Sequence, residues 1–135
     1  MNPLYIVWKE DHHIGIPILD EQHHAIVATI NSLYFFIQEG WGLSALKPTL
    51  SIIKVYSAFH SKTEEGLLLK LQYPSLIKHI DCQKQFEKKV DEITDEAITS
   101  RDPQVLLSFL RDWWRNHLLL EHQDYVTYFD KLKNK

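Results

Sequence analysis

Four long stretches of the chain carry apolar residues three or four positions apart, the spacing that places side chains on one face of an α-helix. They span residues 20–38, 44 or 48 to about 71, 74–99 and 102–131. Because short turns separate them, we predict an all-α fold, an up-down-up-down four-helix bundle. The predicted inward stripes contain Ile26, Ile30, Leu33 and Ile37; Ile53, Tyr56, Leu67 and Leu71; Leu76, Phe86, Val90, Ile93 and Ala97; and Leu106, Phe109, Trp113 and Leu120.

Residues that start and stop helices stand at the ends of these stretches. Asp20 is a good N-cap for the first helix, and Gly40 favours its end. Pro74 suits the first turn of the third helix. Asp102 followed by Pro103 is a strong start signal for the fourth helix.

The segment before the first helix is different in character. Residues 1–18 mix apolar side chains with Pro3, Gly15 and Pro17, which disfavour a continuous helix. We predict an extended N-terminal arm laid against the core. With 135 residues, the chain has the length of one domain, so we expect a single domain over residues 1–135, with the bundle at 19–132.

Composition narrows the classes of partner. The net charge of -3 gives no broad basic surface, so we expect no nucleic acid partner. No apolar run approaches the roughly 20 residues that cross a bilayer, and the first residues do not form a signal peptide. We therefore expect a cytoplasmic protein that does not enter the membrane. Cys82 is the single cysteine, so no internal disulfide is possible.

Five ionisable residues fall on the predicted inward stripes. They are His23, His60, Glu64, His79 and His117, and every one of the four helices supplies at least one. A buried polar group without a partner costs about 1 to 3 kcal/mol. One such histidine alone is more often a core side chain that hydrogen-bonds the backbone. Five together indicate a metal site between the helices.

The types of side chain limit the metal. His60 and Glu64 lie one helical turn apart, so an imidazole nitrogen and a carboxylate oxygen can reach the same ion or two adjacent ions. Imidazole with carboxylate suits iron, manganese or zinc better than calcium or copper(I).

The order and spacing of these residues resemble the hemerythrin family over nearly the whole chain. That family is a four-helix bundle that holds two non-haem irons and binds dioxygen reversibly as carrier, store or sensor. The resemblance implies that His23 and His60 bind one iron, that Glu64 bridges, and that His79 and His117 bind the other iron. The matching residues are Trp8, Ile18-Leu19-Asp20-Glu21-Gln22-His23, His60 with Glu64-Glu65, Tyr73-Pro74, His79 and Phe86, and Trp113 with His117.

Three positions depart from the family pattern. Gln83 replaces a second histidine of the third helix, His122 replaces a bridging aspartate, and Trp114 replaces a small aliphatic residue at the edge of the ligand pocket. In one interpretation His122 supplies the missing imidazole, although five residues after His117 it is rotated by about 140° unless a π-bulge intervenes. Glu121, one turn after His117, is an alternative second carboxylate.

In the other interpretation the bundle has changed use and holds one metal or none.

From the resemblance as a whole, we expect a di-iron protein that binds or senses dioxygen or a related small oxidant. A degenerate regulatory or interaction module is the alternative. We expect a monomer that is not an enzyme, although an oxidase or peroxidase side activity remains an alternative. A sensing role would suit a fused or partner output domain. We expect His12, His13 and His24 to lie on the surface.

Overall fold

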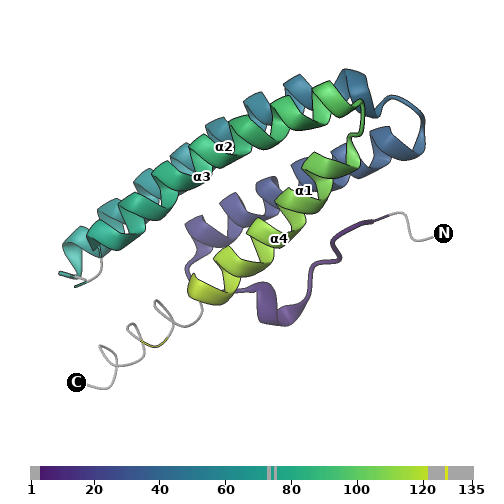
Figure 1. The fold of residues 1–135 in the computed structure, drawn as a ribbon. Helices are drawn as coiled ribbons and strands as arrows, with labels where there is room; N and C mark the ends of the chain where they lie inside the picture. Colours follow the sequence, from purple (N-terminus) through teal and green to yellow (C-terminus); the bar gives the residue numbers. More distant parts are fainter. Residues whose placement is uncertain (1–3, 73, 75, 122–126, 128–135) are drawn as a thin grey trace.

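The computed structural model describes residues 4–72, 74, 76–121 and 127, with the side chain of Glu121 excepted. It contains four helices, α1 (Pro17–Gln38), α2 (Gly42–Lys70), α3 (Leu76–Ser100) and α4 (Gln104–Glu121). Successive helices run in opposite directions (Figure 1). The predicted all-α, up-down-up-down bundle is confirmed.

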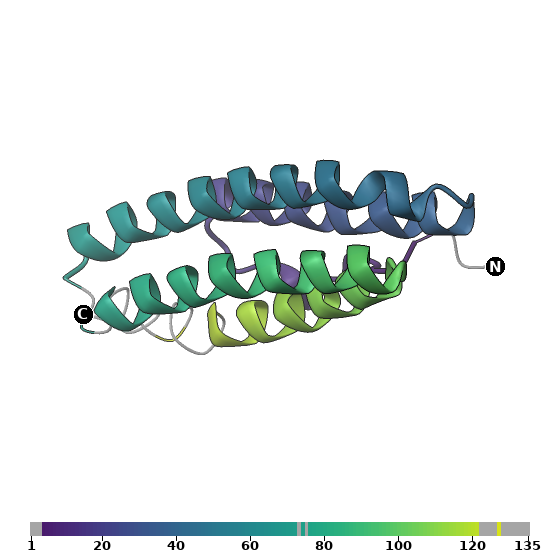
Figure 2. The same cartoon turned by 45° about the horizontal axis from the view of Figure 1, so that its top comes forward.

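The four helices surround one core. Each helix contacts the preceding one, and α4 closes the ring against α1. Viewed from another side, α1 and α2 form one layer and α3 and α4 the other (Figure 2). No helix within the described residues combines the length and apolar character that spanning a membrane requires. The most deeply buried apolar side chains include Ile26, Ile30, Leu33, Leu46, Ile53, Val90, Ala97, Leu106, Leu107 and Leu110.

The predicted helix starts are partly right. Asp102 caps the fourth helix as expected, because its carboxylate accepts the N–H of Gln104 at 3.0 Å. Pro74 precedes α3, which begins two residues later at Leu76. The prediction that Asp20 caps the first helix is wrong, because α1 already begins at Pro17. Proline is favoured in a first helical turn, where its missing N–H has no helical acceptor in any case.

Asp20 instead holds the N-terminal arm. Its carboxylate oxygens accept the N–H groups of Ile14 and Gly15 at 2.9 and 3.2 Å. At the other end of the arm, Asn31 accepts the N–H of Ile6 at 2.8 Å and donates to the carbonyl of the same residue at 2.9 Å. The arm is therefore fixed at two points, with Trp8 between them. A short 3-10 turn, η1 (Glu10–His12), interrupts its extended course.

The turn between α1 and α2 fits closely against the beginning of α4. Gly40 ends the first helix with a φ of 83°, a conformation that favours glycine. A Cβ at Gly42 would lie only 2.7 Å from Cγ of Pro103 and 2.8 Å from Cγ1 of Ile37. Glycine at this buried position therefore allows α1, α2 and α4 to meet.

Two predicted stripes are right at some positions, such as Ile53 and Leu106, and displaced at others. On α2 the buried face includes Ser57 and Leu68, whereas Tyr56 lies at the surface. On α4 it includes Trp114 and Leu118, whereas Leu120 is exposed. Runs of neighbouring apolar residues in both helices offer more than one stripe, so periodicity alone misplaces individual residues such as Tyr56 and Leu120. The predicted end of the fourth helix near residue 131 lies outside the described residues.

Candidate metal centre

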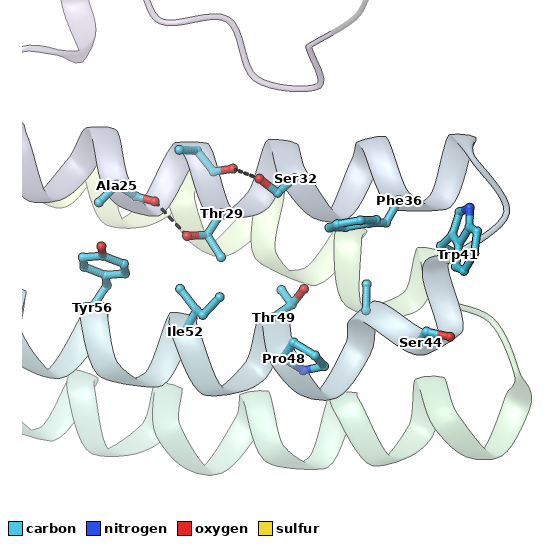
Figure 3. A pocket seen from close by; sticks show the side chains of 12 residues that line it. Ala25, Thr29, Ser32, Phe36, Trp41, Ser44, Pro48, Thr49, Ile52 and Tyr56 are labelled. Carbon is cyan, nitrogen blue, oxygen red and sulfur yellow. Dashed lines mark hydrogen bonds between the residues drawn. The ribbon is translucent and has the colours of Figure 1, made fainter.

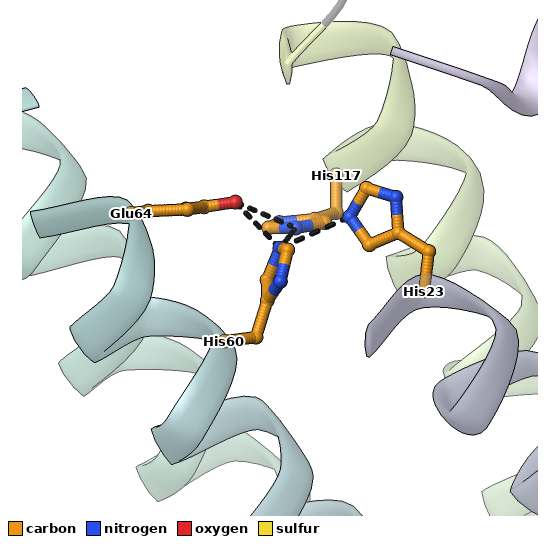
Figure 4. A group of neighbouring side chains, drawn as sticks. All are labelled: His23, His60, Glu64 and His117. Carbon is orange, nitrogen blue, oxygen red and sulfur yellow. Dashed lines mark hydrogen bonds and ion pairs between the residues drawn. The ribbon is translucent and has the colours of Figure 1, made fainter. Parts of the chain in front are cut away.

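The five predicted inward residues come together near the start of α1 and the end of α4. His23 projects from α1, His60 and Glu64 from α2, and His117 from α4, toward a common point (Figure 4). His79 on α3 contacts the same carboxylate. His23, His60 and Glu64 are buried, whereas His79 and His117 retain some contact with solvent.

Three imidazoles face one another through the same ring atom. Nε2 of His60 lies 3.0 Å from Nε2 of His23 and 3.1 Å from Nε2 of His117. One ligand atom from each of these histidines and one from Glu64 all lie within 4.8 Å of one another. Such a set of four donors has the composition of a cation site in a helical bundle.

The two carboxylate oxygens of Glu64 face different sides. Oε1 lies 2.5 Å from Nε2 of His60 and 3.8 Å from that of His117. Oε2 lies 2.5 Å from Nε2 of His79. The carboxylate therefore lies between the imidazoles on its Oε1 side and His79 on its Oε2 side.

The grouping of His117 differs from the one that the family resemblance implies. The resemblance pairs His117 with His79, but the bundle places His117 beside His60 and His23 on the Oε1 side of Glu64. Among the described residues, the Oε1 side thus has three imidazoles. The Oε2 side has His79.

A hydrogen-bond chain behind the cluster orients His60. The Thr63 hydroxyl donates to the Phe59 carbonyl at 2.9 Å and accepts the amide N–H of Gln22 at 2.9 Å. The amide oxygen of Gln22 then faces Nδ1 of His60 at 3.0 Å and accepts its proton. This contact leaves Nε2 of His60 with a lone pair directed at the cluster.

The resulting arrangement fits a cation. The lone pair on Nε2 of His60 faces a carboxylate oxygen of Glu64 and the Nε2 atoms of His23 and His117. Lone pairs that face one another in a buried site repel unless a proton or a metal ion lies between them. A proton on one atom relieves one of these contacts at a time, whereas a metal ion bound by all four atoms relieves them together.

Aromatic rings enclose the cluster on the α4 side. Trp114, only 3% exposed, meets His23 nearly edge to face, with ring centres 5.0 Å apart. Trp113 stacks on His117 at 5.2 Å. Trp8 of the arm lies beyond Trp114, with ring centres 6.2 Å apart. Ring packing on this side limits access to His23.

The remaining predicted site residues are Gln83, His122 and Glu121, and none of them is seen to join the cluster within the described residues. Gln83 lies one turn after His79, but its amide nitrogen is directed at Ser57 and Glu87, each at 3.4 Å. His122 lies outside the described residues, and so does the side chain of Glu121. The assignment of metal ligands, including these residues, stays a prediction.

The three histidines predicted to lie on the surface gather around Trp8. His13 and His24 are exposed, as expected, while His12 is half-buried. His24 stacks on the Trp8 indole with ring centres 3.7 Å apart. The indole N–H of Trp8 donates to Nε2 of His13 at 3.1 Å. These rings therefore hold the arm and do not join the buried cluster.

Gln22 contacts the cluster in a way that sequence reasoning missed. It directly precedes His23, and on a helix neighbouring side chains point about 100° apart, which suggests that Gln22 avoids the cluster. In the bundle it reaches sideways to α2 and contacts His60 from behind. The available signal for this contact was a polar residue, Gln22, directly beside the predicted ligand His23.

Comparison with known proteins defines the class of protein. Residues 14–129 match the hemerythrin HHE cation binding domain. The match covers most of the chain, including all five residues of the buried cluster. The chain therefore belongs to the hemerythrin family of helical, cation-binding domains, as the resemblance predicted.

Individual relatives are consistent with this assignment. The chain is 26% identical over 126 residues to a bacteriohemerythrin of Clostridium acetobutylicum, covering 89% of this chain and 98% of the relative. It is 28% identical over 122 residues to a bacteriohemerythrin of Stenotrophomonas maltophilia, covering 90% and 79% of the two chains. It is also 28% identical over 123 residues to a bacteriohemerythrin of Pseudomonas aeruginosa, covering 90% and 80%.

Proposed function

We propose that this protein holds non-haem iron at the histidine and glutamate cluster and uses it to bind or sense dioxygen or a related small oxidant. The observation that carries the proposal is the convergence of three buried or half-buried imidazoles and one carboxylate from three helices. Nitrogen and carboxylate oxygen donors suit iron. Bound iron would supply the electrons that a small oxidant accepts, and membership of the hemerythrin family favours this chemistry.

The first metal position uses the Oε1 side of Glu64. His23, His60 and His117 would hold an ion there together with Oε1, a set of four donors. Gln22 supports this position by fixing the ring of His60. Partners behind a ligand commonly change metal affinity about 10- to 100-fold. We therefore assign the tighter binding to this side.

The second metal position uses the Oε2 side. His79 and Oε2 are the donors that the described residues place there. Gln83 would join only after its amide turns away from Ser57 and Glu87. His122, or alternatively Glu121, would complete this position. We therefore propose a di-iron centre whose second ion is bound more weakly than the first.

This asymmetry also supports the second candidate function. A position with two described donors loads poorly at limiting iron, and the chain would then carry one ion. A bundle with one metal or none suits a regulatory or interaction module. The two candidates share the fold and differ in metal content and in response to an oxidant.

Metal content and visible absorption test the proposal. Protein prepared with excess ferrous iron under anaerobic conditions, then desalted and exposed to air, is expected to retain two irons per chain and to develop the absorption of an oxo-bridged pair. One iron per chain without these bands would favour the regulatory module. An absence of bound iron would contradict both the di-iron proposal and any iron-based role.

Two histidine variants make this test specific. His60→Ala is expected to abolish stable iron loading, because His60 contacts both His23 and His117 and also Glu64. His24→Ala is the matched control, because His24 lies on the same helix as His23 but stacks on Trp8 at the surface. Equal iron content in the two variants would show that the buried cluster does not hold the metal.

A further inference from the structure

A trough of about 450 Å³ lies between α1 and α2. None of the five clustered residues lines it. Figure 3 shows side chains of α1 and α2 directed toward each other across this space. Its volume falls within the range of about 300 to 1,000 Å³ that is usual for small-molecule sites. The trough is therefore a candidate binding site independent of the metal.

Aromatic side chains bound the trough at both ends. Small side chains such as Ala25, Ala28 and Ser32 leave room along α1. Tyr56 stands toward one end, and Phe36 and Trp41 stand toward the other (Figure 3). Aromatic rings at both ends limit the length of an occupant. A partner helix laid along the trough would have to displace these rings, whereas a compact molecule fits between them.

The lining is complementary to an uncharged occupant. None of the twelve residues that the structure places around the trough is charged, although charged residues make up 24% of the chain. The hydroxyls of Thr29 and Ser32 donate to backbone carbonyls of Ala25 and Ala28, each at 2.8 Å. Their protons are thus already used within α1. Burying an ionic group here would leave its charge without a counterpart.

The aromatic and aliphatic walls are unusually open to solvent. Trp41 is 64% exposed, Ile52 45%, Phe36 41% and Tyr56 38%. A single exposed apolar side chain is ordinary, but several that share one concave region mark a surface that binds something. Flat rings at both ends can stack on a ring of the occupant.

We propose that this trough binds an uncharged, largely apolar small molecule that carries an aromatic ring. The ring would insert between Tyr56 and the Phe36 and Trp41 pair, above the small side chains of α1. This binding does not need iron, so its failure and the failure of the metal proposal are separate results. A second copy of the chain is the competing occupant of an exposed apolar surface.

Fluorescence of a defined probe tests this inference. N-phenyl-1-naphthylamine is uncharged and brightens in apolar surroundings. With full-length protein, its titration is expected to saturate at one probe per chain, with energy transfer from tryptophan that weakens in Trp41→Leu. Its sulfonated analogue, 8-anilino-1-naphthalenesulfonate, differs by one negative charge and is expected to bind at least about tenfold more weakly, since the lining offers no cation.

A matched pair of variants locates the binding. Ser32→Phe places a ring in the trough and is expected to weaken probe binding by about tenfold or more. Ser51→Phe makes the same change at another exposed helical serine, outside the trough, and is expected to leave binding unchanged. Circular dichroism melting shows whether each variant is folded.

Three results would overturn the inference. They are the absence of saturable binding to the wild-type protein, equal binding by folded Ser32→Phe and Ser51→Phe variants, and equal affinity for the neutral and sulfonated probes. Sedimentation velocity addresses the competing occupant. A wild-type dimer that Ser32→Phe dissociates would assign the trough to a second copy of the chain, whereas a monomer with and without the probe agrees with the small molecule.

Discussion

The amide oxygen of Gln22 lies 3.0 Å from Nδ1 of His60 and thereby determines which nitrogen of that ring faces Glu64. Thr63 fixes the orientation of the amide, because its hydroxyl accepts from the amide nitrogen. A contact between α1 and α2 thus orients a buried histidine.

Gln22→Leu removes the acceptor for the Nδ1 proton of His60 while preserving much of the side-chain volume. We expect affinity for the first metal ion to fall by about 10- to 100-fold. Gln22→Glu keeps an acceptor and should restore most of the affinity. Competition titration against a coloured chelator measures both variants. Equal affinity of Gln22→Leu and the wild-type protein would show that this contact does not support the metal.

The two sides of Glu64 predict different outcomes for two histidine variants. His79→Ala removes the imidazole on the Oε2 side and should leave about one firmly bound iron per chain. His23→Ala removes a donor from the four-membered cluster and should weaken the tighter ion. Iron counting after dialysis against a chelator separates them. If His79→Ala lost all iron and His23→Ala lost none, our order of binding strength would be reversed.

Trp114 should restrict the entry of small ligands. Trp114→Leu opens space beside His23 and is expected to speed azide binding to iron-loaded protein in stopped-flow absorbance measurements. The lost packing should lower the free energy of unfolding by about 2 kcal/mol. Trp41→Leu is the control, because Trp41 is largely exposed and does not contact the cluster. Identical azide binding rates for the two variants would contradict a gating role for Trp114.

Two glycines of α2 should respond in opposite directions to the same change. Gly42→Ala forces a Cβ to within 2.7 Å of Pro103 and should destabilise the protein by about 1 to 3 kcal/mol. Gly66→Ala meets no atom within 4 Å and should stabilise it by up to about 1 kcal/mol through helix propensity. Urea denaturation measures both free energies of unfolding. A stabilising Gly42→Ala would show that this helix junction is not closely packed.

Local pattern was sufficient for much of the fold and for the location of the cluster. The helical period correctly placed His23, His60 and Glu64 inside, since each interrupts an apolar stripe in an otherwise regular helix. Asp102 was also predictable, because its capping contact involves a residue only two positions away. These features depend on neighbours along the chain.

Features that depend on contacts beyond a single helix could not be predicted in this way. Asp20 has the chemistry of a cap, but the arm supplies its partners at Ile14 and Gly15. Likewise, the place of His117 beside His60 depends on how α4 lies against α2, which spacing within α4 does not encode. The role of Gln22 was hidden for the same reason.

The double attachment of the N-terminal arm has a mechanical consequence. A pull applied ahead of Tyr5 is borne first by the hydrogen bonds of Asn31 with Tyr5 and Ile6 and by that of Arg111 with the Tyr5 hydroxyl, and Trp8 stays in place until they break. Beyond that threshold, Trp8 would peel away and uncover Trp114, leaving the Asp20 contacts as an anchor from which the segment can reseat.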